Sequence, residues 1–300
     1  MKKMIAILLI GTILIAGGCS RTKLAVPEQG YTILEADGYD GFVTSAKHTT
    51  EINLSRKRTV DVKGNKEKEI NYRGSNYQVT YEETVQDAYY NQKVELYAKR
   101  DGLNCVEFGV NTKTGRLDSY SWYDETYLNN PNLEKKSREE CLGVAREYLA
   151  LYIDDPEQYE LTGEKYVETP EYEADYEFCF VRMIDGVRTA DLARIRVTVH
   201  GIVTYHGFVC LGEMKGAQLP DEEKMIAIQE DIKKKLDGIY EMVKEKYDVS
   251  YELDKMEFVR LQDGRYALDF HYTVNVCSLI NEEVLPMQDY TRLIAILEDA

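Results

Sequence analysis

The chain has 300 residues, with 37 Lys and Arg against 53 Asp and Glu, which gives a formal net charge of −16. This balance excludes a nucleic-acid binder that relies on a basic surface, and an apolar share of 44% excludes a wholly disordered chain. The 20 glycines, 6 prolines and 6 cysteines are too few for a collagen-like or disulfide-dense protein.

The chain begins with a segment that is typical of an export signal. Lys2 and Lys3 precede an almost wholly apolar run over residues 4–16. A helix of that length rises about 20 Å, less than the roughly 30 Å of a bilayer's hydrocarbon core, so the run fits a signal peptide better than a permanent span. We therefore predict a lipoprotein-type signal peptide over residues 1–18 and a mature chain outside the cytoplasm.

The end of this segment, Ile15-Ala16-Gly17-Gly18-Cys19-Ser20, resembles a bacterial lipobox. The resemblance implies that a diacylglyceryl group is attached to Cys19 and that the chain is cut just before it. The protein would then be anchored to the cell membrane on its extracytoplasmic face. Lipoboxes usually carry leucine three residues before the cysteine, where this chain has Ala16. Two alternatives stay open: ordinary secretory cleavage that leaves Cys19 without lipid, and an uncleaved anchor.

After the signal peptide, the sequence predicts a tether and then a β-rich region. Residues 19–30 have little apolar content, which is typical of a tether that holds an acidic body clear of the membrane. We predict an N-terminal β-rich region over 31–130. Basic residues between 56 and 68 favour a solvated hairpin or loop there, with an anion or lipid-headgroup patch as the alternative. Alternating apolar residues from Tyr77 onward predict strands.

Two later segments each combine a helix with the strands that follow it. In the first unit, 131–216, Ser137 and Glu140 predict a capping box at the start of a helix with one apolar face. In the second unit, 217–300, an apolar stripe predicts a helix over 221–247. Turns are predicted at Asp185-Gly186, His200-Gly201 and Asp263-Gly264. The predicted fold class is therefore α+β, with repeated units of one helix packed on an antiparallel β-meander sheet.

This order resembles the PepSY and related cystatin-like modules of lipoproteins from Gram-positive bacteria. The resemblance covers about residues 77–297 and includes the hairpin Asn111-Thr112-Lys113-Thr114-Gly115-Arg116-Leu117. It implies a non-catalytic protein, because family members usually lack catalytic activity; several are thought to inhibit peptidases or to act as regulatory ectodomains. The family supplies no catalytic residue that could be carried over to this chain.

Cysteine spacing gives no sign of a metal or redox site. The smallest gap among the cysteines after Cys19 is 31 residues, which excludes zinc-knuckle and thioredoxin-like spacing. We favour buried free thiols; one disulfide between Cys179 and Cys210, or a nucleophilic cysteine, are the alternatives. The sequence leaves the pairing open for Cys105, Cys141, Cys179, Cys210 and Cys277.

The other candidates for chemistry are few. His200 and His206 flank a predicted hairpin and could approach one another, although ordinary turn and strand roles are favoured. Lys113-Thr114-Gly115 matches one element of penicillin-binding enzymes, but the other elements are missing, so a hairpin turn is favoured. Asp154, Asp155 and Glu157 form an acidic cluster that we interpret as solvated helix-end carboxylates rather than a calcium site.

Tyrosine is abundant, with 24 residues. One group of aromatic residues could form an exposed surface suited to a peptide or a glycan, since aromatic rings give contact area at low entropy cost. The favoured account is that a thin sheet buries the rings and leaves the hydroxyls in water. The group consists of Tyr89, Tyr90, Tyr120, Trp122, Tyr123 and Tyr127.

These patterns favour a membrane-anchored extracytoplasmic lipoprotein that binds or regulates a protein partner at the cell envelope without catalysis. Its partners would be the membrane, through lipid on Cys19, and an envelope protein at the sheet face or an exposed edge; nucleic acid is not expected. We expect no catalytic residue, cofactor or metal. The alternative is a cell-envelope hydrolase acting on peptide or glycan substrates through scattered carboxylates or through His200 and His206.

Overall fold

The structure is a computed structural model. It describes residues 29–39, 41, 43–60, 66–87, 89, 90, 92–128, 130, 132–168, 174–278 and 287–298. Among these residues, 54% lie in strands and 17% in helices. The predicted signal peptide, most of the predicted tether and Cys19 lie outside the described residues.

The described elements are fourteen strands, four α-helices and one short 3-10 helix. In chain order they are β1 (Tyr31–Glu35), β2 (Arg56–Thr59), β3 (Glu67–Tyr72), β4 (Ser75–Asp87), β5 (Gln92–Asp101), β6 (Asn104–Asn111), β7 (Leu117–Tyr123), α1 (Glu125–Leu128), α2 (Arg138–Leu149), η1 (Pro156–Gln158), β8 (Tyr159–Glu168), β9 (Ala174–Ile184), β10 (Val187–Thr198), β11 (Val203–Val209), α3 (Glu222–Ile239), α4 (Glu241–Lys244), β12 (Tyr247–Arg260), β13 (Tyr266–Ser278) and β14 (Met287–Leu297).

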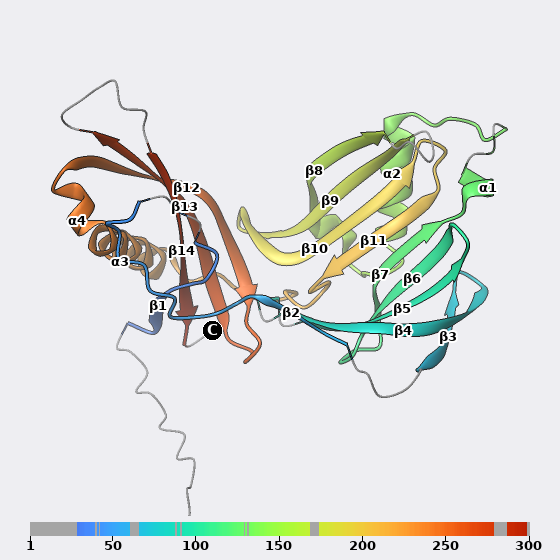
Figure 1. Cartoon of the computed structure of the whole chain (residues 1–300), viewed down its shortest axis with the longest axis horizontal. Helices are drawn as coiled ribbons and strands as arrows, with labels where there is room; N and C mark the ends of the chain where they lie inside the picture. The colour runs from blue at the N-terminus through green and yellow to red at the C-terminus, as the bar shows by residue number, and fades with distance from the viewer. Residues whose placement is uncertain are drawn as a thin grey trace, which may run out of the picture.

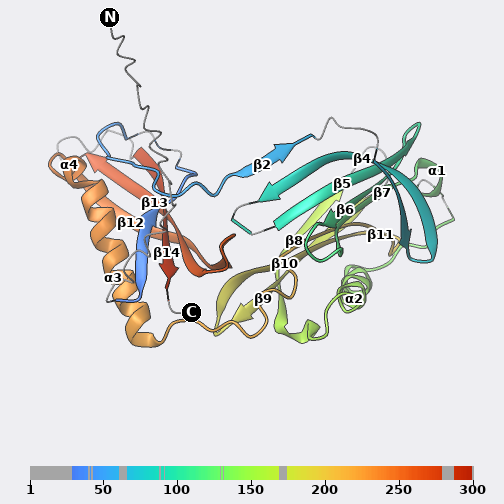
Figure 2. The ribbon, with the colours of Figure 1, turned by 90° about the horizontal axis from the view of Figure 1, so that it is seen from below.

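All fourteen strands belong to one sheet. Its main path runs β1-β14-β13-β12-β10-β11-β7-β6-β5-β4-β2. Off this path, β3 pairs with β4, β9 pairs with β10, and β8 pairs with β9. The strands form two groups (Figure 1). We call β1, β12, β13 and β14 with α3 and α4 the C-terminal lobe, and β3 to β11 with α2 the central lobe. Figure 2 shows α3 along the outer side of the C-terminal lobe.

The predicted α+β fold of repeated helix-and-meander units is wrong. The strands that follow each helix do not form separate sheets, because β11 pairs with β7 and β10 pairs with β12, which joins all the strands into one sheet. Strands from the N-terminal region add further to this sheet, so the protein is mostly β. Hydrophobic periodicity shows which face of a strand is buried, but it does not show which strand edges pair.

Helix α2 begins where the sequence predicts. The Ser137 hydroxyl accepts a hydrogen bond from the Glu140 amide, and the Glu140 carboxylate accepts one from the Ser137 amide at 2.7 Å. This capping box satisfies amides that would otherwise lack partners at the first turn. The apolar face of α2 then packs on β9 and β10, with Cys141, Ala145 and Leu149 almost fully buried.

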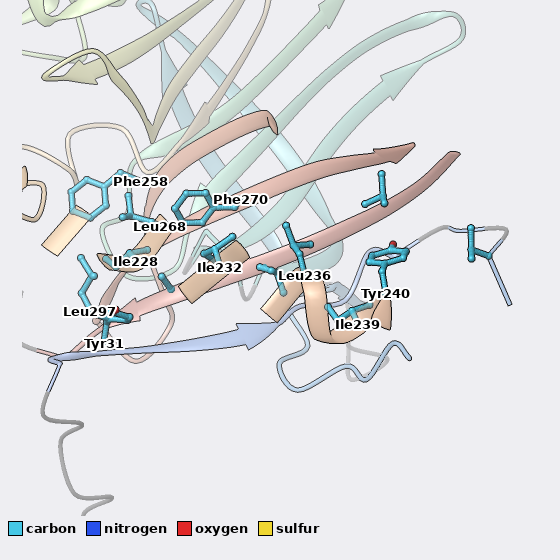
Figure 3. Close-up of a cluster of buried hydrophobic side chains, with 14 of the residues drawn as sticks. Tyr31, Ile228, Ile232, Leu236, Ile239, Tyr240, Phe258, Leu268, Phe270 and Leu297 are labelled. Atoms are coloured by element: carbon cyan, nitrogen blue, oxygen red, sulfur yellow. The ribbon is translucent and has the colours of Figure 1, made fainter. Parts of the chain in front are cut away.

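Helix α3 covers the C-terminal lobe. Ile228, Ile232 and Leu236 lie on one stripe and pack against Phe258 and Phe270 of the sheet (Figure 3). The helix ends at Ile239 rather than continuing to residue 247 as predicted. The overestimate arises because apolar residues at helical spacing continue past the helix end and overlap an alternating, strand-like pattern at the start of β12.

The turns and the first strand complete the fold. Asp185 and Gly186 both have positive φ, +48° and +79°, and form the predicted two-residue turn between β9 and β10. β1 pairs with β14 along its whole length, so the first described strand joins the last. The basic strand β2 pairs with the end of β4, and its four residues are all exposed.

The two lobes meet at a narrow junction. β10 and β12 share only two parallel residue pairs, Arg188 with Glu257 and Thr189 with Phe258. A separate cluster of buried side chains fills the junction from both lobes; it includes Tyr89, Ala190, Cys210, Val259, Ala267 and Ile294. Side-chain packing at this cluster therefore supplements a short strand pairing.

Candidate binding cleft

A cleft of about 560 Å³ opens on the central lobe, and six aromatic side chains line it. It lies between the β3–β4 hairpin, the end of β7, α1, α2 and the β10–β11 turn. We call it the aromatic cleft and define it by Tyr72, Tyr77, Tyr120, Trp122, Tyr127 and Tyr148.

The rim of the aromatic cleft carries exposed apolar groups. Leu151 is 72% exposed and Tyr127 is 48% exposed, although both are large hydrophobic residues. The rings of Trp122 and Tyr127 meet edge to face, with 5.5 Å between centroids. Arg73 and Glu147 add one charge of each sign to the lining. Tyrosine, tryptophan and arginine are the residues that dominate binding energy in protein interfaces.

Tyr72 and Tyr148 of the cleft floor belong to a directional chain of neutral hydrogen bonds. His206 donates from Nε2 to the Leu117 carbonyl at 3.2 Å, so its Nδ1 accepts from the Tyr148 hydroxyl at 2.6 Å. The Tyr148 oxygen then accepts from Tyr72 or Tyr152. Burial lowers the pKa of His206 to about 3, so the imidazole is neutral at physiological pH. This chain fixes the orientation of the rings that form the floor.

The two histidines flanking the β10–β11 hairpin have separate partners. His206 is fully buried within the central lobe. His200 lies in the turn, where its Nδ1 is 3.2 Å from the Glu134 carbonyl oxygen. Each imidazole ring is therefore held by the backbone carbonyl of a different residue, Leu117 for His206 and Glu134 for His200. These are the ordinary roles of a strand histidine and a turn histidine.

The five cysteines after Cys19 are all free thiols in the structure. Cys141 and Cys210 are buried, Cys105 and Cys179 are partly buried, and Cys277 is exposed. Burial raises the pKa of Cys210, whose thiol donates to the Tyr90 carbonyl at 2.8 Å. The disulfide considered between Cys179 and Cys210 is not formed.

A second hollow, of about 480 Å³, lies on the opposite face of the central strands. Its floor includes Ser119 and Ser121, which alternate along β7 with the cleft residue Tyr120. Gly109, Ser119 and Gly207 are direct neighbours across β6, β7 and β11. A Cβ atom at Gly109 would collide with Ser119, and one at Gly207 with Tyr205, so neither position has room for a larger residue.

Asp118 and Glu107, two carboxylates that line this second hollow, have structural partners. Asp118 accepts from Gln92 and Asn111, each at 2.6 Å, and from Arg116 at 2.7 Å. Glu107 accepts from Arg100 at 2.6 Å. A hydrolase needs two carboxyl groups that face one pocket and can exchange protons with the substrate, whereas these groups are committed to neighbouring donors.

The remaining sequence candidates also have structural roles. Asp155 is buried and forms an ion pair with Arg182 at 3.0 Å, so the interpretation of the acidic cluster as solvated carboxylates is wrong for this residue. Thr114 and Gly115 lie in the β6–β7 turn, where the Asn111 side chain accepts from the Thr114 amide. Among the described residues, no group of three or more His, Cys, Asp or Glu side chains is placed to hold a metal ion.

The predicted aromatic surface is divided between two places. Tyr120, Trp122 and Tyr127 line the aromatic cleft, but the first is buried and forms its wall. Tyr89 and Tyr90 instead lie at the junction between the lobes. The sequence did not indicate the contributions of Tyr72, Tyr77, Arg73 and Leu151, since these residues come from other elements that only the folded chain brings together.

The described elements contain neither the predicted lipid anchor nor a helix that could span a membrane. Cys19 lies outside them, and no described helix combines the length and apolar character needed to cross a bilayer.

No family model matches the chain, and no curated protein matches it. Among solved structures, the chain is similar to the Bacillus megaterium YpeB C-terminal domain, with 13% sequence identity over 76% of this chain and 92% of that domain. The TM-score is 0.32, too low for the likeness to support an argument about this chain.

Proposed function

We propose that this chain is a non-catalytic extracytoplasmic binding protein that holds a segment of a protein partner in the aromatic cleft. Lipid on Cys19 anchors it to the cell membrane, as the lipobox-like sequence favours. The observation that carries the proposal is the exposed apolar rim formed by Tyr127 and Leu151 over a cleft lined by aromatic side chains. Burial of this rim by a partner would remove apolar surface from water.

The fixed floor supports binding by a preorganised surface. The hydrogen-bonded chain from Tyr72 through Tyr148 to His206 holds rings that would otherwise lose rotational freedom when a partner binds. Preorganised aromatic groups lower the entropy cost of association. Arg73 and Glu147 at the lining offer one donor and one acceptor group, which suits the mixed polarity of a peptide backbone and its side chains.

Site-specific photocrosslinking tests the proposal. A photoreactive amino acid replaces Leu151 at the cleft rim or, as a matched control, the equally exposed Leu103, which does not line the cleft. We expect a discrete crosslinked protein at position 151 in intact cells, with no such product at 103. The crosslink should disappear when Trp122→Ala is added. Equal labelling at both positions, or a crosslink that survives Trp122→Ala, would show that the cleft is not the binding site.

A further inference from the structure

The outer edge of β12 lacks a strand partner over most of its length. β13 pairs with β12 from Tyr247 to Arg260, whereas β10 pairs with it only at Glu257 and Phe258. Within the described part of the chain, Tyr247 to Met256 therefore present one row of backbone amide and carbonyl groups without a neighbouring strand. Such an edge is a template for another extended segment.

This edge is held rigidly from one side. Tyr247, Val249 and Tyr251 face the buried cluster beneath α3 and α4. The Tyr251 hydroxyl donates to Asp237 of α3 at 3.0 Å, and the Lys244 ammonium of α4 lies 5.1 Å from the Tyr251 ring centroid. The free edge is therefore preformed, and an added strand would not have to order it.

The exposed face of the same edge is acidic. Asp248, Ser250 and Glu252 alternate with the inward residues, and all three are exposed. The described structure gives neither Asp248 nor Glu252 an ion-pair partner. A second copy of this chain would bring like charges together at the edge, which is unfavourable for strands that lie side by side. A basic strand would place opposite charges there instead.

A β-bulge limits the length of regular pairing. The register between β12 and β13 shifts between Leu253 and Lys255, and bulges commonly end strand pairing. The regular part of the edge, Tyr247 to Leu253, spans about 23 Å at the rise of a β-strand.

We propose that this edge of β12 binds an extended segment of another protein in which basic residues alternate with apolar residues. The segment adds a strand beside β12, its backbone pairs with Tyr247 to Leu253, and its Lys or Arg side chains lie opposite Asp248 and Glu252. The apolar residues point toward α4 and continue the inward face of the lobe. This surface is distinct from the aromatic cleft and goes beyond the proposed function.

The test uses a synthetic peptide that alternates lysine and valine and has the length of the regular edge. Amide hydrogen exchange is measured in full-length protein with and without the peptide. We expect slower exchange for alternate amides between Tyr247 and Leu253, an effect that weakens as salt is added. A peptide that alternates glutamate and valine should give no protection. Equal protection by both peptides, or no slowing in β12, would overturn the proposal.

Charge-reversal variants provide the matched control. Asp248→Lys combined with Glu252→Lys should weaken binding of the lysine peptide about tenfold or more, because two attractive pairs become repulsive. Glu223→Lys combined with Glu230→Lys reverses the same amount of charge on the exposed face of α3 and should leave binding unchanged. An equal loss of affinity for the lysine peptide in both double variants would show that binding depends only on the net charge of the protein, and would contradict the proposal.

Two further measurements separate the alternatives. Trp122→Ala should leave peptide binding at β12 unchanged, which distinguishes failure at this edge from failure of the proposed function at the cleft. Protection of β12 that grows with protein concentration in the absence of peptide would show that a second copy occupies the edge, and would overturn the proposal of a basic partner.

Discussion

The Tyr89 hydroxyl lies 2.6 Å from Asp269 Oδ2, which links a hairpin of the central lobe to the middle of the C-terminal lobe. The same hydroxyl lies 2.9 Å from Glu257 Oε2, and both carboxylates are almost fully buried. The Arg292 guanidinium lies 4.5 Å from the Tyr89 ring centroid and donates to Asp269 at 3.1 Å. The Tyr89 phenol of the central lobe therefore contacts two buried carboxylates of the C-terminal lobe, across a junction where β10 and β12 share only two residue pairs.

We expect Tyr89→Phe to lower the free energy of unfolding by about 1–3 kcal/mol, since the buried carboxylates lose their shared donor. Tyr90→Phe is the matched control, because Tyr90 lies in the same hairpin and its hydroxyl has no hydrogen-bond partner among the described residues. Its effect should be below about 0.5 kcal/mol. Urea unfolding measures both; equal effects would mean that the hydroxyl of Tyr89 does not stabilise the junction.

The buried ion pair of Arg182 should be worth more than an exposed one. Arg182 is 1% exposed and donates to Asp191 at 2.9 Å and to Asp155. Arg182→Met leaves Asp191 buried without its cation, so we expect a loss of about 3–5 kcal/mol. Arg138→Met, which breaks the more exposed pair with Glu164, should cost much less, because solvent screens that pair.

A double-variant cycle checks that assignment. Adding Asp191→Asn to Arg182→Met removes the buried charge that the single variant leaves behind, so the double variant should be less destabilised than the sum of the two single variants. Strictly additive losses in urea unfolding would contradict direct coupling between these side chains.

Histidine burial predicts a specific dependence of stability on pH. The pKa of His206 falls from about 6.5 in the unfolded chain to about 3 in the folded protein, mainly through burial. Below about pH 6.5 the unfolded chain binds a proton that the folded chain does not bind. The free energy of unfolding should therefore fall as pH decreases from 7 to 5, with a contribution that approaches about 1.4 kcal/mol per pH unit.

Two variants isolate this contribution. His206→Gln removes the titrating group and should flatten the pH dependence between 7 and 5. His200→Gln, in the turn after β10, should leave the slope of the wild-type protein unchanged. Parallel slopes for all three proteins would show that His206 is not the source of the dependence.

The rim of the aromatic cleft should contribute to binding but not to folding. Leu151 is 72% exposed, so Leu151→Ser should change the free energy of unfolding by less than about 0.5 kcal/mol. The same variant should weaken capture of the partner identified by crosslinking. A large loss of stability on substitution would mean that the rim has a structural role instead.

Local patterns in the sequence predict local structure well. Ser137 and Glu140 identify the start of α2, and Asp185-Gly186 identifies a turn, because capping and turn chemistry depend on neighbouring residues alone. The end of α3 is less clear, since Val243 and Tyr247 extend its helical spacing into the next strand. Each of these predictions concerns residues that are close in sequence.

Long-range pairing is where prediction from the sequence fails. The contact between β1 and β14 joins the first and last described strands, and no periodicity within either strand encodes it. The aromatic cleft also depends on residues that are far apart in the sequence. Trp122 and Tyr127 are detectable as an aromatic group, but Tyr72 and Tyr148 come from β3 and α2, which only the folded chain brings beside them.

Trp122 offers the most direct measurement of the central claim, because it is the only tryptophan in the chain and lines the aromatic cleft. Its fluorescence is followed while the crosslinked segment of the partner is added as a synthetic peptide, with the affinity measured independently by calorimetry. If the cleft holds the partner, the Trp122 emission changes as peptide is added until it saturates, and this titration gives the same affinity as calorimetry. Binding heat without any change in Trp122 emission would contradict the account.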